Sequence, residues 1–528
     1  MTTSETPDTS TTTPGRPTER RGHVAELLSA TVARQPDAVA LRVGDARITY
    51  RELDQATAAT AGWLRARGVQ PGDRVAVMLP TVPAFVGVYE ALMRIGAVMV
   101  PLNPLFTPRE LRYFLEDSGA RILWTMPGLP AVDEVAADPE VDVQVVTDDL
   151  ESIAKACAAE GIAPVTEITP RDPDDDAVLL YTSGTTGRPK GARLTHTNLR
   201  SNAMATATGL GRLGPDVVVF AALPMFHVFG LSVVLNGAVF AGSTLSLMPR
   251  FEPEAAYDQL QDHGITFLPG VPTMHGAFLA VARARREAGA EPADFSRLRM
   301  PLSGGASLPV DTLHAAEKLF GVPVLEGYGL SENAGACFFN PVDAPTRPGT
   351  VGRPVDGFEF RIVAMDGTEV PEEDLETSGE LRIRGEGIMA GYWGRPEDTE
   401  AAFDEDGWFR TGDIARRDEA GYVVIVDRLK DVIIRGGMNV YPREVEEVLY
   451  EHPDVTEAAV VGVGDERLGE EVVAFVSVTP GSTVSEEELK AFAAERLARY
   501  KQPRAVTIMD GLPKNATGKI LRRELRQG

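Results

Sequence analysis

The stretch YTSGTTGRPKG, residues Tyr181–Gly191, combines glycine, hydroxyl and basic residues in the way expected of an anion-binding loop. It continues the segment DDAVLLYTS, whose apolar run is typical of a buried strand that leads into the loop. The Walker A order is absent, because Gly187 is followed by two other residues before Lys190, and a glycine stands at the hydroxyl position. The stretch therefore predicts a strand and a phosphate-binding loop of a different kind.

Each residue type in this loop has a separate task in holding a polyphosphate. Hydroxyl groups donate hydrogen bonds, glycines let backbone N–H groups approach an anion closely, and a lysine adds positive charge. The residues that would supply these groups are Thr182, Ser183, Gly184, Thr185, Thr186, Gly187 and Lys190. The alternative is a surface turn with a chance mixture of these residues, but eleven residues in this order directly after a strand favour the cradle.

Composition excludes several classes of function. The 528 residues carry a formal net charge of −25, which argues against nucleic acid as a partner, because phosphate neutralisation needs clustered Lys and Arg. The chain has two cysteines, Cys157 and Cys337, so we expect neither a disulfide framework nor a cysteine-ligated zinc site. A reducing cytoplasm is the expected location. The sequence leaves a monomer and a homodimer open.

The N-terminus and the apolar segments give no sign of membrane insertion. Residues 1–21 are rich in Ser, Thr and Pro and predict a disordered tail that is neither a signal peptide nor an anchor. The nearest candidate for a membrane span is FGLSVVLNGAVFAG at 229–242. Asn236 and three glycines interrupt it, so a buried core helix is predicted there and no membrane span is expected.

The order of segments predicts an α/β protein of two domains joined by a hinge. Helical and strand patterns alternate from His23 to about Met300, which indicates mainly parallel sheets flanked by helices. Short strands between Gly and Asp turns then predict a small antiparallel sheet or β-barrel. The large domain is placed at 22–427, the hinge at 428–432 and a small α+β domain at 433–528, with Ser485 as a helix N-cap.

Four further motifs follow the loop in a characteristic order. They are GYGLSE (327–332), GWFRTGD (407–413), VDRLKDVIIRGGMNVYPREVE (426–446) and LPKNATGKILRREL (512–525). Together with YTSGTTGRPKG they resemble the signature motifs of the adenylate-forming superfamily, which includes acyl-CoA synthetases, aryl-CoA ligases, luciferases and peptide-synthetase adenylation domains. The resemblance covers about residues 23–528.

This resemblance implies two half-reactions that use ATP, Mg²⁺ and coenzyme A. A carboxylate attacks the α-phosphate of ATP and gives an acyl-adenylate and pyrophosphate. A thiol, usually that of coenzyme A, then displaces AMP. The loop at 181–191 would hold the β- and γ-phosphates as they depart. The small domain would be mobile and would rotate between the two half-reactions.

The resemblance gives the catalytic roles to residues that would otherwise be unremarkable. Lys519 alone would be a surface lysine in a glycine-containing turn, but the motif makes it the lysine that stabilises charge during adenylation. Glu332 alone would be a solvated glutamate, but the motif makes it the ligand of Mg²⁺.

The nucleotide-binding residues are assigned in the same way. Tyr328 would lie against adenine and Asp413 would accept from both ribose hydroxyls, with Arg428 adding a contact to the ribose. Ser331 stands where the family usually has Thr and keeps the hydroxyl for the α-phosphate. The segment LSGGASL resembles the adenine-pocket loop, with a plain glycine turn as the alternative. The remaining residues assigned to the nucleotide are Gly305, Ala306, Gly327 and Gly329.

The resemblance also assigns roles to two residues connected with the mobile small domain. Lys430 matches the hinge residue of the family, which must absorb a large backbone change. Gly437 matches the glycine that lets the pantetheine arm of coenzyme A reach the adenylate.

The segment LPMFHVFG (223–230) resembles the aromatic motif beside the acyl pocket. His227 is either a satisfied core histidine or, by the resemblance, a catalytic-site residue near the carboxylate. Amino-acid-activating relatives carry Asp at this position, so amino-acid substrates are disfavoured. The predicted pocket, which is apolar, is lined by Phe226, His227, Phe229, Gly230, Gly304 and Cys337.

A medium- or long-chain fatty acid is the favoured substrate, and an aromatic acid is the second choice. Two other classes stay open. One is a fatty-acyl-AMP ligase that stops at the adenylate or passes the acyl group to an acyl-carrier protein. The other is a non-catalytic adenylate-binding homologue, or one that uses an unusual nucleophile, although the presence of Lys519, Glu332 and Asp413 argues against loss of activity.

Overall fold

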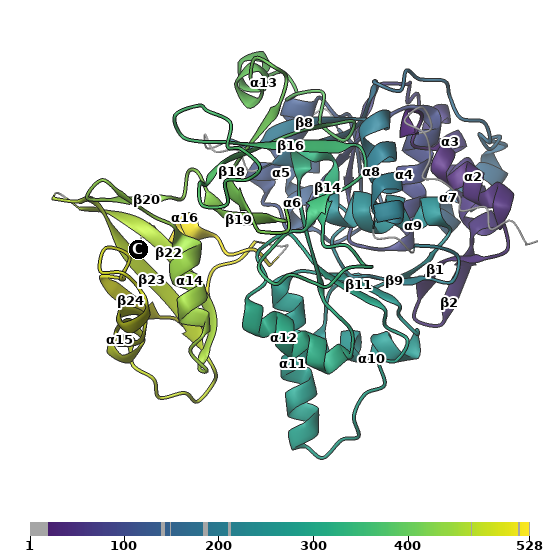
Figure 1. The fold of residues 1–528 in the computed structure, drawn as a ribbon. Helices are drawn as coiled ribbons and strands as arrows, with labels where there is room; N and C mark the ends of the chain where they lie inside the picture. Colours follow the sequence, from purple (N-terminus) through teal and green to yellow (C-terminus); the bar gives the residue numbers. More distant parts are fainter. Residues whose placement is uncertain are drawn as a thin grey trace, which may run out of the picture.

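The computed structural model describes residues 20–138, 143–147, 149–182, 188–209, 213–465, 467–515 and 518–526. The chain forms a large unit that contains three sheets and a smaller C-terminal unit with a sheet of its own (Figure 1). This arrangement confirms the predicted α/β class, with mainly parallel sheets followed by a small α+β unit. Residues 1–19 of the predicted tail lie outside the described residues.

A six-stranded sheet carries the strand of the opening motif. Its order is β6-β5-β3-β4-β7-β8, and all pairs are parallel except the antiparallel pair β7–β8. The central strands are buried on both faces, as expected of parallel strands covered by helices. The strands are β3 (Arg74–Met78), β4 (Val98–Pro101), β5 (Ile122–Thr125), β6 (Gln144–Val146), β7 (Asp176–Thr182) and β8 (Lys190–Thr195).

A nine-stranded sheet forms the other half of the large core. Its order is β15-β14-β13-β12-β11-β9-β10-β1-β2, parallel in the middle and antiparallel at both edges. The strands are β1 (Val39–Val43), β2 (Ala46–Thr49), β9 (Val218–Ala221), β10 (Thr244–Leu247), β11 (Phe267–Gly270), β12 (Met300–Ser303), β13 (Leu325–Leu330), β14 (Gly335–Phe339) and β15 (Arg353–Pro354).

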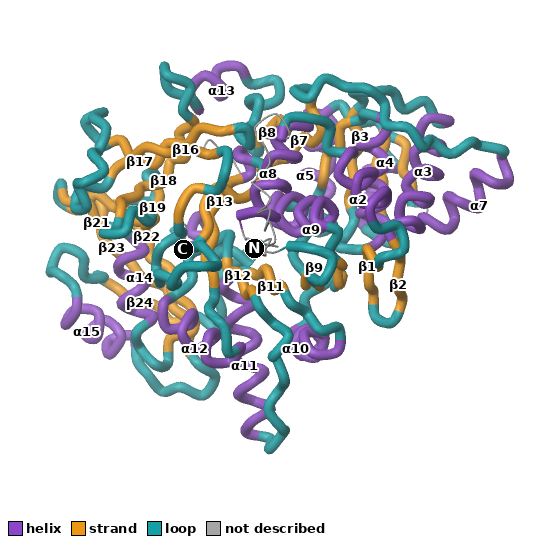
Figure 2. The backbone as a smooth tube through the Cα atoms, turned by 45° about the vertical axis from the view of Figure 1, so that its right-hand side comes forward, coloured by secondary structure: helices purple, strands orange, loops and turns teal. Residues whose placement is uncertain are grey.

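Helices cover these sheets, and two of them, α4 and α8, are buried along most of their length. In both views α10, α11 and α12 lie together below β11 (Figures 1 and 2). The helices of the large unit before the third sheet are α2 (Glu26–Arg34), α3 (Tyr50–Ala66), α4 (Pro83–Ile95), α5 (Pro108–Ser118), α6 (Pro130–Ala136), α7 (Leu150–Glu160), α8 (His196–Gly209), η1 (Phe229–Asn236), α9 (Gly237–Ala241), α10 (Pro253–Asp262), α11 (Pro272–Glu287), α12 (Val310–Phe320) and η2 (Ser331–Asn333).

The predicted core helix at 229–242 is confirmed, with a local difference. Its first part, η1, is a π-helix, and α9 continues it as an α-helix. Gly230 lies at the close approach, because a Cβ there would be 2.2 Å from the Pro224 carbonyl oxygen. Among the described helices, none is both long and apolar enough to cross a membrane.

The third sheet is four-stranded and antiparallel, in the order β16-β17-β18-β19. Its strands are β16 (Phe358–Val363), β17 (Gly379–Gly385), β18 (Phe409–Arg417) and β19 (Val423–Arg428), and α13 (Pro396–Ala402) lies between β17 and β18 in the sequence. Of the two predicted alternatives, a small antiparallel sheet or a β-barrel, the pairing gives the antiparallel sheet, which is open with β16 and β19 as its edges.

The C-terminal unit has its own apolar core between one sheet and two helices. Ser485 is confirmed as an N-cap, because its side chain and that of Glu488 form a capping box. The elements are β20 (Ile433–Arg435), β21 (Met438–Val440), α14 (Pro442–Tyr450), β22 (Val455–Asp465), β23 (Gly469–Val478), α15 (Glu486–Arg496), β24 (Ala505–Ile508) and α16 (Arg522–Leu525).

The loop before α16 reaches from the C-terminal unit to the large unit (Figure 1). A Cβ at Gly518 would be 2.7 Å from the Thr273 hydroxyl oxygen near the start of α11, so this loop contacts the large unit closely. Lys519, the predicted catalytic lysine, directly follows.

Candidate active site

Asp413 is the centre of a cluster that three strands bring together. It lies on β18, and the antiparallel register places it opposite Arg428 of β19. Arg428 Nε donates to Asp413 Oδ1 at 3.1 Å, and the Tyr328 hydroxyl of β13 donates a short hydrogen bond to Oδ2. The Asp413 backbone N–H donates to the Thr411 hydroxyl oxygen at 3.1 Å. Asp413 is only 2% exposed. Burial of an unpaired carboxylate would be energetically unfavourable, and the donors on Arg428 and Tyr328 offset this cost.

Burial, followed by the charge of Asp413, raises the pKa of Tyr328 well above its usual value, so its hydroxyl remains a donor at neutral pH. Each carboxylate oxygen can accept more than one hydrogen bond. Asp413 therefore has acceptor capacity for a bound ligand, although both of its oxygens are already engaged.

The glycines around Tyr328 are required by neighbouring strands. A Cβ at Gly329 would be 1.7 Å from the Gly335 carbonyl oxygen, and one at Gly327 would be 2.6 Å from the Phe339 ring. A Cβ at Gly304 would be 3.1 Å from the Phe229 ring. The contacts of Gly329 and Gly327 let β13 pack against β14 and set the position of Tyr328. Gly305 differs, since it is exposed beside Ala306 and has φ +79°.

Lys519 enters this region from the C-terminal unit. Its loop is a tight turn in which the Lys519 N–H donates to Asn515 Oδ1 at 2.9 Å. Protein surrounding the ammonium, and then the positive charge of Arg428, lower the Lys519 pKa to about 8, while Asp413 opposes this shift. The residue retains solvent-exposed surface, which moderates the cost of keeping its charge. These interactions place Lys519 near Asp413 and Arg428.

His227, which precedes η1 in the large unit, lies close enough to Lys519 to interact with its charge. The Phe229 backbone N–H donates to His227 Nδ1 at 3.3 Å, so the neutral ring carries its proton on Nε2. Burial, followed by the charge of Lys519, lowers the His227 pKa to about 4. The imidazole is therefore neutral at physiological pH, and its side chain is half-buried.

The predicted acyl-pocket residues fall into two groups. Phe226, His227 and Phe229 are half-buried and keep some accessible surface. Gly230, Gly304 and Cys337 are buried. Cys337 is 0% exposed, and its thiol lies 3.7 Å from the Tyr328 carbonyl oxygen.

Glu332 is held from both its backbone and its side chain. Met389 N–H donates to the Glu332 carbonyl at 2.8 Å, and the Tyr392 hydroxyl donates to Glu332 Oε1 at 3.1 Å. Ser331, which precedes it in η2, is half-buried. Among the described residues, no group of three or more metal-binding side chains is present. A single carboxylate fits Mg²⁺, which takes its remaining ligands from phosphates and water rather than from a protein cage.

The two ends of the predicted phosphate loop are fixed by the hairpin β7–β8, in which Thr182 pairs with Lys190. Lys190 Nζ forms an ion pair with Asp398 of α13 at 2.5 Å and lies over the Tyr392 ring at 5.4 Å. The predicted cradle residues Ser183, Gly184, Thr185, Thr186 and Gly187 lie outside the described residues.

The two residues predicted for the mobile small domain, Gly437 and Lys430, are both exposed. Gly437 lies in the turn between β20 and β21, which points away from the large unit (Figure 1), and a Cβ there would have no neighbour within 4 Å. Lys430 is exposed on the connection after β19; surrounding protein, followed by the charge of Arg428, lowers its pKa.

Tyr392 and Asp398 contact predicted site residues but were missed in the sequence. The motif GYWGRPED that contains them has no composition typical of a site. Their contacts arise only because the segment after β17 pairs with β8.

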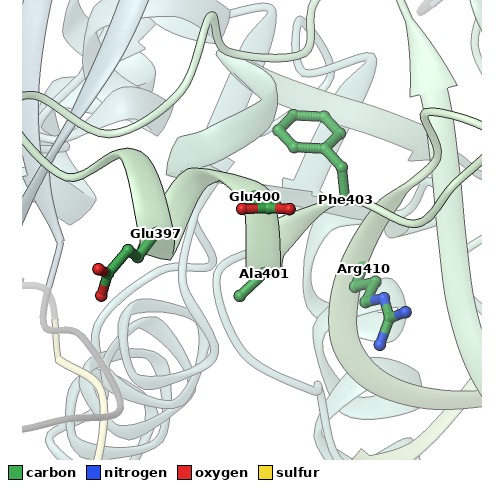
Figure 3. Close-up of a pocket in the computed structure, with 5 residues that line it drawn as sticks. All are labelled: Glu397, Glu400, Ala401, Phe403 and Arg410. Carbon is green, nitrogen blue, oxygen red and sulfur yellow. The ribbon is translucent and has the colours of Figure 1, made fainter.

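The outer side of α13 borders an open surface pocket of about 400 Å³, where Glu397 and Arg410 lie at opposite ends (Figure 3).

Comparison with known proteins gives matches along nearly the whole chain. The profile of the AMP-binding enzyme family matches residues 28–393, and that of the AMP-binding enzyme C-terminal domain matches residues 444–519. A long-chain-fatty-acid–CoA ligase of Bacillus subtilis (strain 168) is 36% identical, covering 94% of this chain and 93% of its own length. A feruloyl-CoA synthase of Amycolatopsis sp is 39% identical, covering 93% and 96%.

Solved structures give the same result and add information on conformation. ATP-bound MatB from Rhodopseudomonas palustris is 35% identical and superposes with a TM-score of 0.86, covering 95% of this chain and 98% of that chain. The apo form of the same protein gives a TM-score of 0.76 over the same shares of both chains. The present structure therefore superposes more closely on the ATP-bound form than on the apo form.

Proposed function

Given that the chain belongs to the AMP-binding enzyme family and is an acid–thiol ligase of its acyl- and aryl-CoA ligase branch, we propose that it activates an apolar carboxylic acid. A medium- or long-chain fatty acid is favoured, and coenzyme A is the acceptor. The observation that carries this proposal is the meeting of Lys519, His227 and the Asp413–Arg428 pair in one place.

The first half-reaction forms the acyl-adenylate. A carboxylate oxygen of the acid attacks the α-phosphorus of ATP, the bond to the β-phosphate oxygen breaks, and pyrophosphate leaves. Asp413 would accept from the ribose hydroxyls, and Arg428 would remain beside it. Lys519 would stabilise the negative charge that builds on the carboxylate and the α-phosphate, because a positioned ammonium offsets charge where it develops.

The polyphosphate end of ATP would lie at the turn between β7 and β8. Lys190 supplies charge there, and Glu332 would hold Mg²⁺. When bound, this cation offsets phosphate charge and favours the departure of pyrophosphate. Tyr328, Gly305, Ala306 and Ser331 would surround the adenine and the α-phosphate.

The second half-reaction transfers the acyl group to a thiol. The sulfur of coenzyme A attacks the acyl carbon, the bond to the AMP oxygen breaks, and AMP leaves. Gly437 faces away from the site in this structure, so its proposed role requires the C-terminal unit to rotate about the segment 428–432. The closer similarity to an ATP-bound structure supports assigning the observed arrangement to the adenylation step.

The character of the acyl pocket supports an apolar acid. Phe226 and Phe229 flank His227 in the sequence, and the imidazole is neutral at physiological pH. This histidine stands where an amino-acid-activating enzyme would have a carboxylate for the substrate ammonium. An aryl-CoA ligase is the second candidate, and the 39% identity to a feruloyl-CoA synthase favours it. A ligase that stops at the adenylate or uses an acyl-carrier protein is a further alternative.

The test is ATP-dependent pyrophosphate release over a panel of acids from acetate to palmitate, benzoates, cinnamates and amino acids, with and without coenzyme A. The expected result is a coenzyme A ester of a fatty acid, identified by mass and formed only when coenzyme A is present. Release of pyrophosphate without an ester would instead indicate another nucleophile. Preference for a cinnamate over every fatty acid would establish the aryl-CoA alternative.

A further inference from the structure

Tyr392 contacts two residues that are both proposed to act on the polyphosphate, Glu332 and Lys190. Its hydroxyl donates to Glu332 Oε1 at 3.1 Å, and its ring lies 5.4 Å from Lys190 Nζ. One side chain thus contacts both the proposed metal ligand and the proposed phosphate-binding lysine, which are far apart in sequence.

The backbone holds Tyr392 firmly in this position. It forms an isolated antiparallel bridge with Ala192 of β8, and its own N–H donates to the Thr399 hydroxyl at 2.8 Å. On one side Trp393 N–H donates to the Gly191 carbonyl at 2.8 Å, and on the other Met389 N–H donates to the Glu332 carbonyl at 2.8 Å. The segment 389–393 therefore links the end of the phosphate loop to the backbone of Glu332.

Asp398 completes the arrangement by neutralising Lys190. The Lys190 side chain is 13% exposed, and that of Asp398 is 34% exposed. The Lys190 ammonium is therefore largely removed from water and is paired with a carboxylate of the same chain. A polyphosphate that takes this ammonium must compete with Asp398, which lies closer to solvent than the lysine it neutralises.

We propose that Tyr392 is a positioning residue for the polyphosphate of the bound nucleotide, and that Asp398 is the counter-ion that this polyphosphate displaces from Lys190. The Tyr392 hydroxyl fixes the orientation of the Glu332 carboxylate, and its ring supports the ammonium of Lys190. This inference rests on the proposed function and adds two residues to it.

The substitutions Tyr392→Phe and Asp398→Asn separate the two parts of the proposal. Tyr392→Phe keeps the ring beside Lys190 and removes the hydrogen bond to Glu332. Mg²⁺ should increase the ATP affinity of this variant on the order of 3- to 10-fold less than it does for the unmodified protein. The affinity for ATP without metal should change little. Asp398→Asn removes the competing charge, so ATP without metal should bind several-fold more tightly.

Isothermal titration with ATP, in the absence of any acid, measures both effects without turnover. Titrations are run with Mg²⁺ and with a chelator. Tyr50→Phe is the matched control, because the Tyr50 hydroxyl donates to the Ser243 carbonyl at 2.7 Å in the core of the large unit. This control removes a buried tyrosine hydrogen bond and should leave the Mg²⁺-dependent gain unchanged.

The outcomes are distinct. If Tyr392→Phe shows the same Mg²⁺-dependent gain as the unmodified protein, the positioning role of Tyr392 is wrong. If Asp398→Asn leaves ATP affinity unchanged or weakens it, the counter-ion role of Asp398 is wrong. This test of the counter-ion role does not depend on whether Tyr392→Phe folds. If the unmodified protein binds ATP but releases no pyrophosphate with any acid, the proposed function itself fails.

Discussion

At the residue scale, the ionisable groups of the site hold one another in defined protonation states. Asp413 accepts from Tyr328 and Arg428, and burial together with the Asp413 charge raises the pKa of Tyr328, which keeps the phenol protonated. Lys519 and His227 lie close enough for the lysine charge to lower the histidine pKa. Surrounding protein lowers the pKa of Lys519 itself, so the ammonium loses its proton more easily than a lysine in water.

The first prediction concerns the pH dependence of adenylation. The Lys519 pKa is lowered to about 8, so its ammonium is present below this pH and is lost as the pH rises through it. If the ammonium stabilises the adenylation transition state, pyrophosphate release should decline above about pH 8. Lys519→Arg should extend activity to higher pH, because guanidinium stays charged. A decline at the same pH in both proteins would assign it to another group.

The second prediction separates the two half-reactions. Lys519→Ala should lower the rate of adenylation by roughly 10²–10³-fold, the loss typical of one transition-state contact. Coenzyme A transfer from a preformed acyl-adenylate should be retained, since that step would use a different face of the C-terminal unit. Pre-steady-state measurement of each step tests this. Equal loss of both steps, with unchanged circular dichroism, would contradict the proposed division of work.

At the element scale, the short loop before α16 brings the C-terminal unit to the large one. Lys514 and Ile520 pair as an isolated antiparallel bridge, so the chain turns tightly and presents Lys519. Gly518 has φ +78° and lies against Thr273, so this position excludes a side chain for reasons of both backbone conformation and space.

The third prediction tests this contact. Gly518→Ala should cost about 1–2 kcal/mol for the left-handed backbone alone, and the Thr273 contact adds to this. Adenylation should therefore slow by more than tenfold. Gly481→Ala is the matched control, because Gly481 has φ +85° with no neighbour within 4 Å of the added Cβ. A similar loss of activity in both variants would show that the contact with Thr273 is unimportant.

At the scale of the whole molecule, a charged network centred on Arg522 of α16 spans the junction of the two units. Its guanidinium lies 2.6 Å from Glu446 of α14, 3.5 Å from Asp431 and 3.9 Å from Asp427 of β19. Burial raises the Asp427 pKa to about 6, with Arg522 opposing the shift. This network connects the large unit, the hinge segment and the C-terminal unit.

The fourth prediction is that Arg522→Gln loosens this arrangement. Loss of the guanidinium removes the positive charge beside Glu446 and buried Asp427, which among the described residues keep only backbone N–H donors, so the observed arrangement should become less populated. Trypsin should then cleave after exposed Lys430 several-fold faster, as mass spectrometry would show. Arg496→Gln, on α15 away from the junction, is the control. Unchanged cleavage in Arg522→Gln would show that other contacts hold the units.

Local sequence determined much of this protein. The alternation of apolar segments specified the α/β class, and Ser485 marked a helix start because capping depends on residues three positions apart. The ordered motifs identified the family, which the matches along the chain confirm. The order of residues also indicated Asp413 and Arg428, although not their pairing.

Only the tertiary structure decided which residues meet. Tyr392 and Asp398 reach Glu332 and Lys190 because the segment after β17 pairs with β8, a contact that spans some two hundred residues of chain. Cys337 and Gly230 are buried, and of the predicted sheet or barrel the chain forms the open sheet. Such outcomes depend on packing between distant segments, where burial and close contact are set by the whole fold rather than by neighbouring residues.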